Sequence, residues 1–215
     1  NLIKLPQLDL SEQVLKLEQL VSFFDNPLKA FAQQRLNLKF ETTDQIIEDA
    51  EPFTTNGLSE YQIREQICYA FLDKEADNSA MNIKLIHQLS GQLPESPITE
   101  SSLNSWHEDA EILSQAIIEK GEIFTQTIEQ KVLAISIECN LHWLKKDEQL
   151  LIWRPASRKA KDDLRLWLTH LLATIVSNSP VETIGLFFNK KYKKVESITL
   201  PANLDKEQAN KILAD

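Results

Sequence analysis

The sequence is poor in the residues that build several common kinds of site. It contains only four glycines in 215 residues, and none of them belongs to a glycine-rich loop that could cradle a phosphate group. The two cysteines, Cys68 and Cys139, are far apart and form no motif, which favours a reduced, cytoplasmic setting. The histidines are dispersed, and none has the spacing of a metal ligand: His87, His107, His142 and His170.

Basic charge and long apolar runs are also scarce. Lys and Arg number 23 against 32 Asp and Glu, which gives a net charge of −9 and a pI of about 5.0. This balance argues against a free-standing nonspecific DNA-binding protein, although it leaves local basic patches open. No apolar run approaches the length that spans a bilayer, and the first residues lack the design of a signal peptide. Because helical periodicity continues to the last residue, we expect the chain to belong to a longer protein.

The first part of the chain, residues 1–120, is predicted to be helical. A helix over 11–36, capped by Ser11 and bent at Pro27, is indicated by apolar residues at spacings of three and four. Its expected buried face is Val14, Leu17, Leu20, Val21, Phe24, Leu28 and Phe31. Further helices are expected over 56–74, 80–90 and 105–120. Their expected buried residues are Ile63, Ile67, Ala70 and Phe71, and then Trp106, Ala110, Leu113 and Ile117.

The pattern changes after Gly121. Strands are predicted at 131–139, 140–144, 150–154 and 182–188, with a further one at 196–200. A long helix over 158–178 separates the third strand from the fourth, and a last helix opens at Asp205. The order β-β-β-α-β predicts an α/β (mixed α+β) fold. We expect residues 121–215 to form a mixed sheet with a crossover helix, and the helical part to join it in one structural unit.

Four stretches, in the same order, resemble the RecC family. The first is LVSFFDNPLKAFAQQRLNL at 20–38, which has Asn26-Pro27 where the nuclease domains of the RecB and AddB group have Cys-Pro. The others are EPFTTNGLSEYQIREQI at 51–67, LSGQLP at 89–94, and LLIWRP at 150–155 with LRLWLTHLL behind it. The ordered set covers most of the chain, from about residue 6 to 205.

The resemblance implies a fold and a role. The C-terminal domain of that family has a PD-(D/E)XK restriction-endonuclease-like core and is not catalytic. The implied assembly is exodeoxyribonuclease V, a helicase–nuclease that unwinds and degrades broken double-stranded DNA. In it the RecC subunit holds RecB and RecD, helps to split the duplex, and carries the channels for the separated strands, including recognition of the Chi sequence. For this domain the resemblance implies partner packing and contact with DNA through the complex, without a cofactor or metal.

The metal-binding residues of active PD-(D/E)XK enzymes can be sought directly. Such enzymes hold Mg²⁺ with carboxylates at the ends of adjacent strands, beside a Lys. The third strand has Ile152 and Arg154 in place of the Asp and Lys, and the earlier metal position falls between Cys139 and Lys145. Arg154 cannot act as a base, and Lys145 would repel a cation. These four positions are therefore predicted to be vestigial. A Gln-x-x-x-Tyr motif of active relatives is also replaced, by Arg165 and Thr169.

Two basic clusters are candidate contacts for DNA phosphates. One consists of Arg154, Arg158, Lys159 and Lys161. The other, around Tyr192, consists of Lys190, Lys191, Lys193 and Lys194. Phosphate contact by such groups would be salt-sensitive and blind to sequence. The alternative is a solvated turn that keeps a sheet edge from pairing.

Two other functions remain open from the sequence. The chain could be a divergent active nuclease that uses Glu138, the nearest carboxylate, together with Asp162 or Asp163. By strand alternation Glu138 faces away from Ile135, Ile137 and Cys139, which makes a solvated strand residue the simpler interpretation. The other possibility is that the chain is a stand-alone protein-interaction module.

Overall fold

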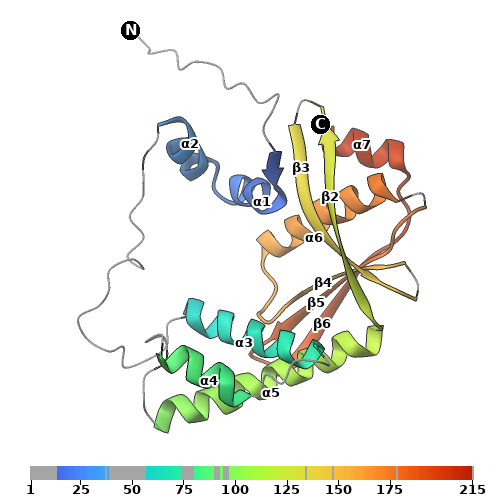
Figure 1. The fold of residues 1–215 in the computed structure, drawn as a ribbon. Coiled ribbons are helices and arrows are strands. Elements are labelled where there is room, and N and C mark those ends of the chain that lie inside the picture. The colour runs from blue at the N-terminus through green and yellow to red at the C-terminus, as the bar shows by residue number, and fades with distance from the viewer. Residues whose placement is uncertain are drawn as a thin grey trace.

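The computed structural model describes residues 14–36, 38, 57–73, 80–89, 93, 97–133, 135–146, 148–177 and 179–214. Helices and sheet are mixed along the chain, so the predicted α/β (α+β) class is confirmed. The described elements form a three-layer arrangement with one twisted sheet in the middle (Figure 1). No described helix is long and apolar enough to cross a membrane.

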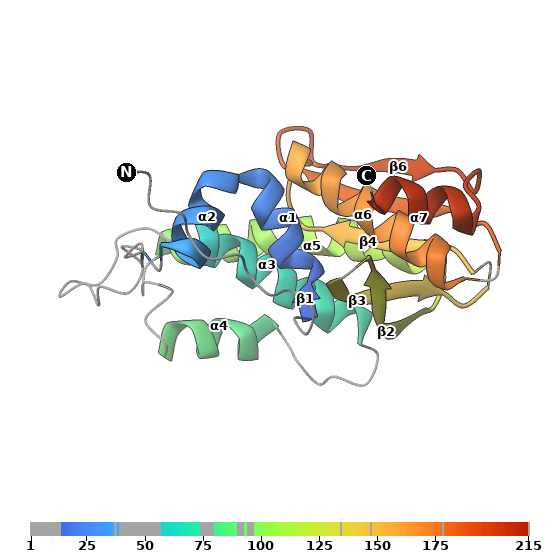
Figure 2. The same cartoon turned by 90° about the horizontal axis from the view of Figure 1, so that it is seen from above.

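The sheet joins strands that lie far apart in the sequence. Its order is β1-β3-β4-β5-β6, with β2 also paired to β3. The strands are β1 (Val14–Lys16), β2 (Ile123–Val132), β3 (Ile135–Leu144), β4 (Leu150–Arg154), β5 (Thr183–Asn189) and β6 (Lys194–Leu200). The β1–β3 and β4–β5 pairs are parallel, and the others are antiparallel. Figure 2 shows β1 beside β3, at the start of α1.

Helices cover both faces of the sheet. On one face lie α3 (Gly57–Leu72), α4 (Ala80–Leu89) and α5 (Pro97–Lys120), gathered at the bottom of Figure 1. Towards the other face lie α1 (Leu17–Asp25), α2 (Pro27–Arg35), α6 (Ala160–Val176) and α7 (Lys206–Ala214). The crossover α6 connects the parallel neighbours β4 and β5, as such a connection requires.

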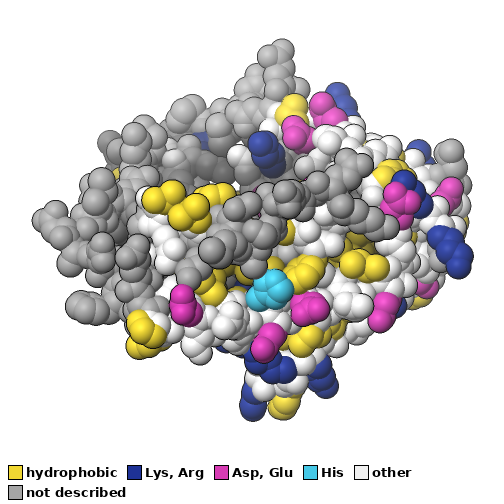
Figure 3. All heavy atoms as spheres, turned by 60° about the horizontal axis from the view of Figure 1, so that its bottom comes forward, with side chains coloured by type: hydrophobic (Ala, Val, Ile, Leu, Met, Phe, Trp, Pro, Cys, Tyr) yellow, Lys and Arg dark blue, Asp and Glu magenta, His cyan; other side chains and the backbone are white. Residues whose placement is uncertain are grey.

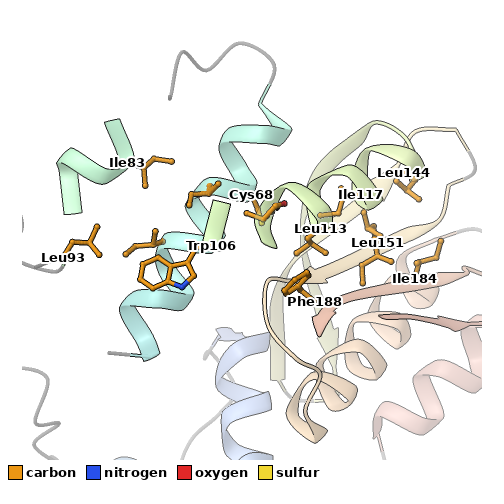
Figure 4. Close-up of a cluster of buried hydrophobic side chains, with 14 residues drawn as sticks. Cys68, Ile83, Leu93, Trp106, Leu113, Ile117, Leu144, Leu151, Ile184 and Phe188 are labelled. Carbon is orange, nitrogen blue, oxygen red and sulfur yellow. Dashed lines mark hydrogen bonds between the residues drawn. The ribbon is translucent and has the colours of Figure 1, made fainter. Parts of the chain in front are cut away.

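The layers have separate apolar cores. Figure 4 shows the core of the α3–α5 layer, where Trp106 and Leu113 of α5 pack with Cys68 of α3, and where Leu151 of β4 and Phe188 of β5 come from the sheet. A second core lies between the sheet and α1 and α6, and includes Val21, Leu141, Leu150 and Leu172. Because successive residues of β4 enter different cores, this short strand is apolar on both faces.

The N-terminal helix differs from its prediction. Residues Val14–Lys16 form a strand, so the helix begins at Leu17, while Ser11 lies outside the described residues. The bend falls where Pro27 predicted it: Asn26 caps α2, its side chain accepting from the Lys29 amide at 3.0 Å. Only Leu17 and Val21 of the predicted face are buried, whereas Leu28 is 82% exposed. The apolar spacing was correct for a helix, but as a guide to burial it was wrong at Val14 and Phe24 as well as beyond the bend.

The later elements match more closely. The periodic residues Trp106, Ala110, Leu113 and Ile117 are buried, although α5 begins at Pro97 and not at Ser105. The two predicted strands over 131–144 are wrong in their boundaries, because a turn at Leu133 separates β2 from a single long β3. Leu133 has a φ of 53°, a conformation that leucine seldom adopts, so no residue at this position signals a turn. The predicted helix over 158–178 and the two strands after it are confirmed.

Candidate functional site

A cavity of about 470 Å³ lies where β3 and β4 face α1, α3 and α6. Its lining includes three of the four positions predicted as vestigial, namely Cys139, Ile152 and Arg154. The fourth, Lys145, is not part of this lining and lies in the turn after β3, where its ammonium binds Glu122 at 2.7 Å. The structure therefore brings the β4 residues and Cys139 together around one hollow and places Lys145 apart from it.

Cys139 and Ile152 contribute apolar contacts. Both pack against the core between the sheet and α6. Burial, together with the negative charge of Glu18, raises the pKa of the Cys139 thiol to about 12. A thiol with such a pKa stays protonated near neutral pH, so Cys139 is not activated as a nucleophile there.

Arg154 is held by a buried carboxylate and by an aromatic ring. Its Nη1 donates to Asp162 Oδ2 at 2.6 Å, and the Asp162 side chain is 3% exposed. The guanidinium carbon lies 5.3 Å from the centre of the Tyr61 ring, within the range of a cation–π contact. Arg154 therefore connects the end of β4 to α3 and to the first turn of α6.

Asp162 also organises the start of α6. The same Oδ2 accepts from the Lys159 amide at 2.9 Å, as the N3 carboxylate of a capping arrangement does. Its other oxygen lies 3.7 Å from Arg165. Asp163 is paired with Arg158. Both carboxylates that were candidates for a metal site are thus bound to arginines.

Arg165 connects α6 to α1. Its Nε and Nη2 donate to the two oxygens of Glu18 at 3.0 and 2.5 Å, a two-pronged contact that fixes both side chains. Arg165 and Thr169 also line the cavity. Thr169 bonds its own helix, donating to the Arg165 carbonyl at 2.7 Å.

Glu138 faces the cavity. It is half-buried and lies on the side of β3 opposite to Ile137 and Cys139, as strand alternation predicted. Across the sheet its neighbours in register are Lys16 on β1 and Glu129 on β2. In the described part of the chain, no group of three or more His, Cys, Asp or Glu side chains is arranged to hold a metal ion. The active-nuclease hypothesis therefore finds no assembled ligand set around Glu138 in that part.

Helix α3 supplies residues to this cavity that no sequence motif had indicated. Tyr61, Glu65 and Tyr69 line the cavity from its far side, and the Tyr61 hydroxyl donates to Glu65 at 2.9 Å. The spacing of four residues places them on one face of α3, but only the fold shows that this face meets β4. Tyr69 makes an edge contact with Trp153 of β4, with ring centroids 5.0 Å apart.

The two predicted basic clusters are largely engaged within the chain. In the first, Arg154 and Arg158 bind aspartates, and Lys161 lies 3.7 Å from Asp25. In the second, the turn between β5 and β6, Lys190 binds Glu60 and Lys193 binds the buried Asp109 at 2.5 Å. On the face seen in Figure 3, described basic side chains occur in small groups next to acidic ones and form no continuous patch.

Three basic residues of the clusters have no carboxylate partner within the described residues. Lys191 and Lys194 lie 5.3 and 5.6 Å from the centre of the Tyr192 ring, which is 61% exposed. Lys159 is exposed at the start of α6. These ammonium groups remain accessible to an anion, whereas their paired neighbours are largely neutralised.

Comparison with known proteins identifies the family of this chain. The family described as RecC C-terminal domain matches residues 12–215. The chain belongs to the RecC C-terminal domain family. This confirms the resemblance drawn from the four stretches, which all lie within the matched range.

Individual relatives carry the same name. The RecBCD enzyme subunit RecC of Escherichia coli K12 is 29% identical over 166 residues, which cover 74% of this chain and 14% of that protein. The RecBCD enzyme subunit RecC of Haemophilus influenzae Rd is 24% identical over 183 residues, covering 78% of this chain and 15% of the relative. The chain thus spans about one seventh of the length of these RecC proteins.

Proposed function

We propose that this chain is a non-catalytic scaffold domain of a RecBCD-type helicase–nuclease, acting in double-strand break repair and recombination. Membership of the RecC C-terminal domain family supports the proposal, because the curated relatives are named as RecBCD enzyme subunits. In this role the domain packs against RecB and RecD subunits and helps to guide unwound DNA. It needs no metal or cofactor of its own.

The core is proposed to derive from the PD-(D/E)XK nuclease fold. The order β2-β3-β4-α6-β5, with the parallel pair β4–β5 on either side of a crossover helix, supports this origin. Cys139, Ile152 and Arg154 would then mark the former metal site, because they line one cavity at the end of β4.

One observation supports a scaffold more than any other. The buried carboxylate nearest the end of β4, Asp162, accepts hydrogen bonds from Arg154 and from the Lys159 amide. A carboxylate fixed in this way stabilises the joint between β4 and α6, and binding Mg²⁺ would first require the loss of its Arg154 ion pair. In the proposed role Arg154, one of the positions predicted to be vestigial, would hold elements together and take no part in chemistry.

The contribution to DNA binding is assigned to the accessible basic residues. Lys191, Lys194 and Lys159 have no carboxylate partner in the described part of the chain, so they are the cluster members best placed to meet phosphates. Arg154, Arg158, Lys161, Lys190 and Lys193 are paired with acidic side chains, and we expect them to contribute less.

The test is assembly and cleavage with the complete subunit that contains this chain. Co-purified with the RecB and RecD homologues of the same organism, it should form a stable complex that degrades linear DNA in Mg²⁺. The chain alone, incubated with linear DNA and Mg²⁺ or Mn²⁺, should leave the DNA intact. Metal-dependent cutting by the chain that Glu138→Ala abolishes would establish the nuclease hypothesis in its place. Failure of the complete subunit to retain either partner would contradict the scaffold role.

A further inference from the structure

The cavity at the end of β4 has acidic groups that its own cations do not neutralise. Arg154 is bound by Asp162, and Arg165 by Glu18. Within the described residues this leaves Glu65, which accepts a hydrogen bond from the Tyr61 hydroxyl alone, and Glu138, which has no ion pair or hydrogen bond there. Lys16 also lines the cavity but makes no ion pair with a described carboxylate. Glu65 and Glu138 are therefore open to a cation from outside.

The sheet itself carries an unfavourable contact at this place. Glu138 of β3 stands directly opposite Glu129 of β2 in the antiparallel register. Like charges directly opposite each other destabilise a strand pair, because the two side chains share one face of the sheet. Lys16 of β1 is the register neighbour of Glu138 on its other side but forms no ion pair with it, so a cation bound to Glu138 would relieve this repulsion.

The other walls suit a flat or alkyl-bearing cation. Tyr69 and Trp153 form an edge-to-face pair that opens onto the cavity, and Tyr69 is 54% exposed. Within the same cavity the Tyr61 ring already has the guanidinium of Arg154 above it. Rings flanked by carboxylates attract guanidinium and ammonium groups through both charge and the ring quadrupole.

The ionisation of nearby groups indicates a negative local field. Burial is the main cause of a Tyr61 pKa of about 12, and the charge of Glu65 raises it further. The pKa of Tyr69 is raised by burial and then by Glu65 in the same way. Glu18 adds to the raised pKa of Cys139 on the opposite wall. A phosphate entering here would meet that field without a free arginine to receive it.

We propose that this cavity receives a basic side chain, an arginine or a lysine, from a partner polypeptide packed on the domain. The inference depends on the proposed scaffold function and assigns one of its contacts. The inserted cation would lie between Glu65 and Glu138, with its alkyl stem or guanidinium plane against Tyr69 and Trp153. The position that held a metal cation in the ancestral enzyme would thus still hold positive charge, supplied by protein.

The experiment follows the tryptophan indole resonances of the 215-residue chain by NMR. Trp153 lines this cavity, while Trp106, Trp143 and Trp167 lie elsewhere and serve as internal references. The probes are N-acetyl-arginine amide, its neutral isostere N-acetyl-citrulline amide, inorganic phosphate and MgCl₂. We expect the arginine probe alone to shift Trp153 in a saturable manner.

The double variant Glu65→Gln/Glu138→Gln removes both charges without changing side-chain size. We expect it to bind the arginine probe about tenfold more weakly, because two charge-assisted contacts are lost. Unchanged reference indoles will show that the variant is folded. The exposed pair Glu111→Gln/Glu119→Gln on α5 is the matched control and should bind as the parent chain does.

The outcomes separate this inference from the function that it rests on. Three results would each contradict the binding of a basic side chain in this cavity. They are an equal shift with the citrulline probe, a shift with phosphate or Mg²⁺, and no shift at Trp153 with any probe. Co-purification of the complete subunit with RecB and RecD homologues could still succeed in all of these cases. If co-purification fails while Trp153 responds to arginine alone, the result supports the binding of a basic side chain in this cavity and contradicts RecB and RecD as partners.

Discussion

At the scale of single residues, Asp162 connects more of the site than any other side chain in it. It is buried, it caps the first turn of α6, and it binds Arg154. We expect Asp162→Ala to lower the free energy of unfolding by about 3 kcal/mol, since removing one partner leaves a partly buried guanidinium uncompensated. Urea unfolding followed by circular dichroism measures the change.

The neighbouring Asp163 provides the control for that substitution. It is paired with Arg158 through two largely exposed side chains. Asp163→Ala should therefore change the free energy of unfolding by less than about 1 kcal/mol. Equal effects of the two substitutions would show that Asp162 does not have the role described.

The cysteines should react slowly. Burial raises the pKa of both Cys68 and Cys139 from 9.0 to about 12. Only the thiolate reacts with a disulfide reagent, so at pH 8 we expect labelling of the native chain to be at least about 100-fold slower than that of the unfolded chain. Ellman's reagent with and without urea gives the two rates. Rapid labelling of the native chain would contradict the buried positions.

The same shift predicts how stability depends on pH. The folded pKa values lie above the unfolded value, so the contribution of these thiols is fully present below pH 9.0. It should be lost as the pH rises from about 9 towards about 12, because only the unfolded state releases the protons in that interval. Replacing both cysteines with Ala should weaken this decline in a pH series of urea midpoints.

At the scale of elements, β5 shows how closely the layers pack. A Cβ added at Gly185 would lie 2.8 Å from side-chain atoms of Ile198 and Phe187 and 3.2 Å from Leu166. Gly185→Ala should therefore destabilise the fold by about 1–3 kcal/mol through overpacking. At Gly57, the first residue of α3, an added Cβ meets nothing within 4 Å, so Gly57→Ala should be neutral or slightly stabilising. Thermal unfolding of both variants distinguishes crowding from a general effect of losing glycine.

The helical spacing of apolar residues predicted the helices that pack against the sheet. Ile63, Ile67, Trp106 and Leu113 recur at helical spacing, and they are buried because those helices have the sheet on one side. The same spacing at Leu28 did not predict burial, since spacing reveals a face but not whether another element covers it. The β2–β3 turn was missed because turn residues of the usual kind are absent at Leu133.

Sequence patterns could predict only some of the residues of the candidate site. Ile152 and Arg154 could be selected because a strand motif fixes their place relative to a known chemistry. Tyr61, Glu65 and Glu18 could not, because they come from elements about 90 to 140 positions away along the chain, and only the packing of α3 and α1 brings them to β4. Long-range packing of this kind leaves no local pattern in a single sequence.

At the scale of the whole molecule, the helical layer is tied to the sheet by ionic contacts as well as by its apolar core. In the turn between β5 and β6, Lys193 donates to Asp109 at 2.5 Å and to Ser105 at 2.9 Å, both on α5. Asp109 is 2% exposed and lies 3.8 Å from the buried Arg64 of α3. Arg64 also binds Glu60, which Lys190 reaches from the same turn. The turn thereby anchors the sheet to two helices at once.

This arrangement predicts opposite roles for two lysines that are close neighbours in the sequence. Lys193→Ala should lower the free energy of unfolding by about 3 kcal/mol, because Asp109 then loses its closest cation while remaining buried. The backbone strain at Lys193, whose φ is 49°, is unchanged because alanine keeps the Cβ. Lys191→Ala, which removes an exposed ammonium beside Tyr192, should change stability by less than about 0.5 kcal/mol. If the function proposed above holds, filter binding of single-stranded DNA by the complex of the complete subunit with its RecB and RecD homologues should be weaker for the Lys191 variant at low salt. The assigned roles would be contradicted if the Lys191 variant were destabilised. They would also be contradicted if the Lys193 variant were as stable as the parent chain.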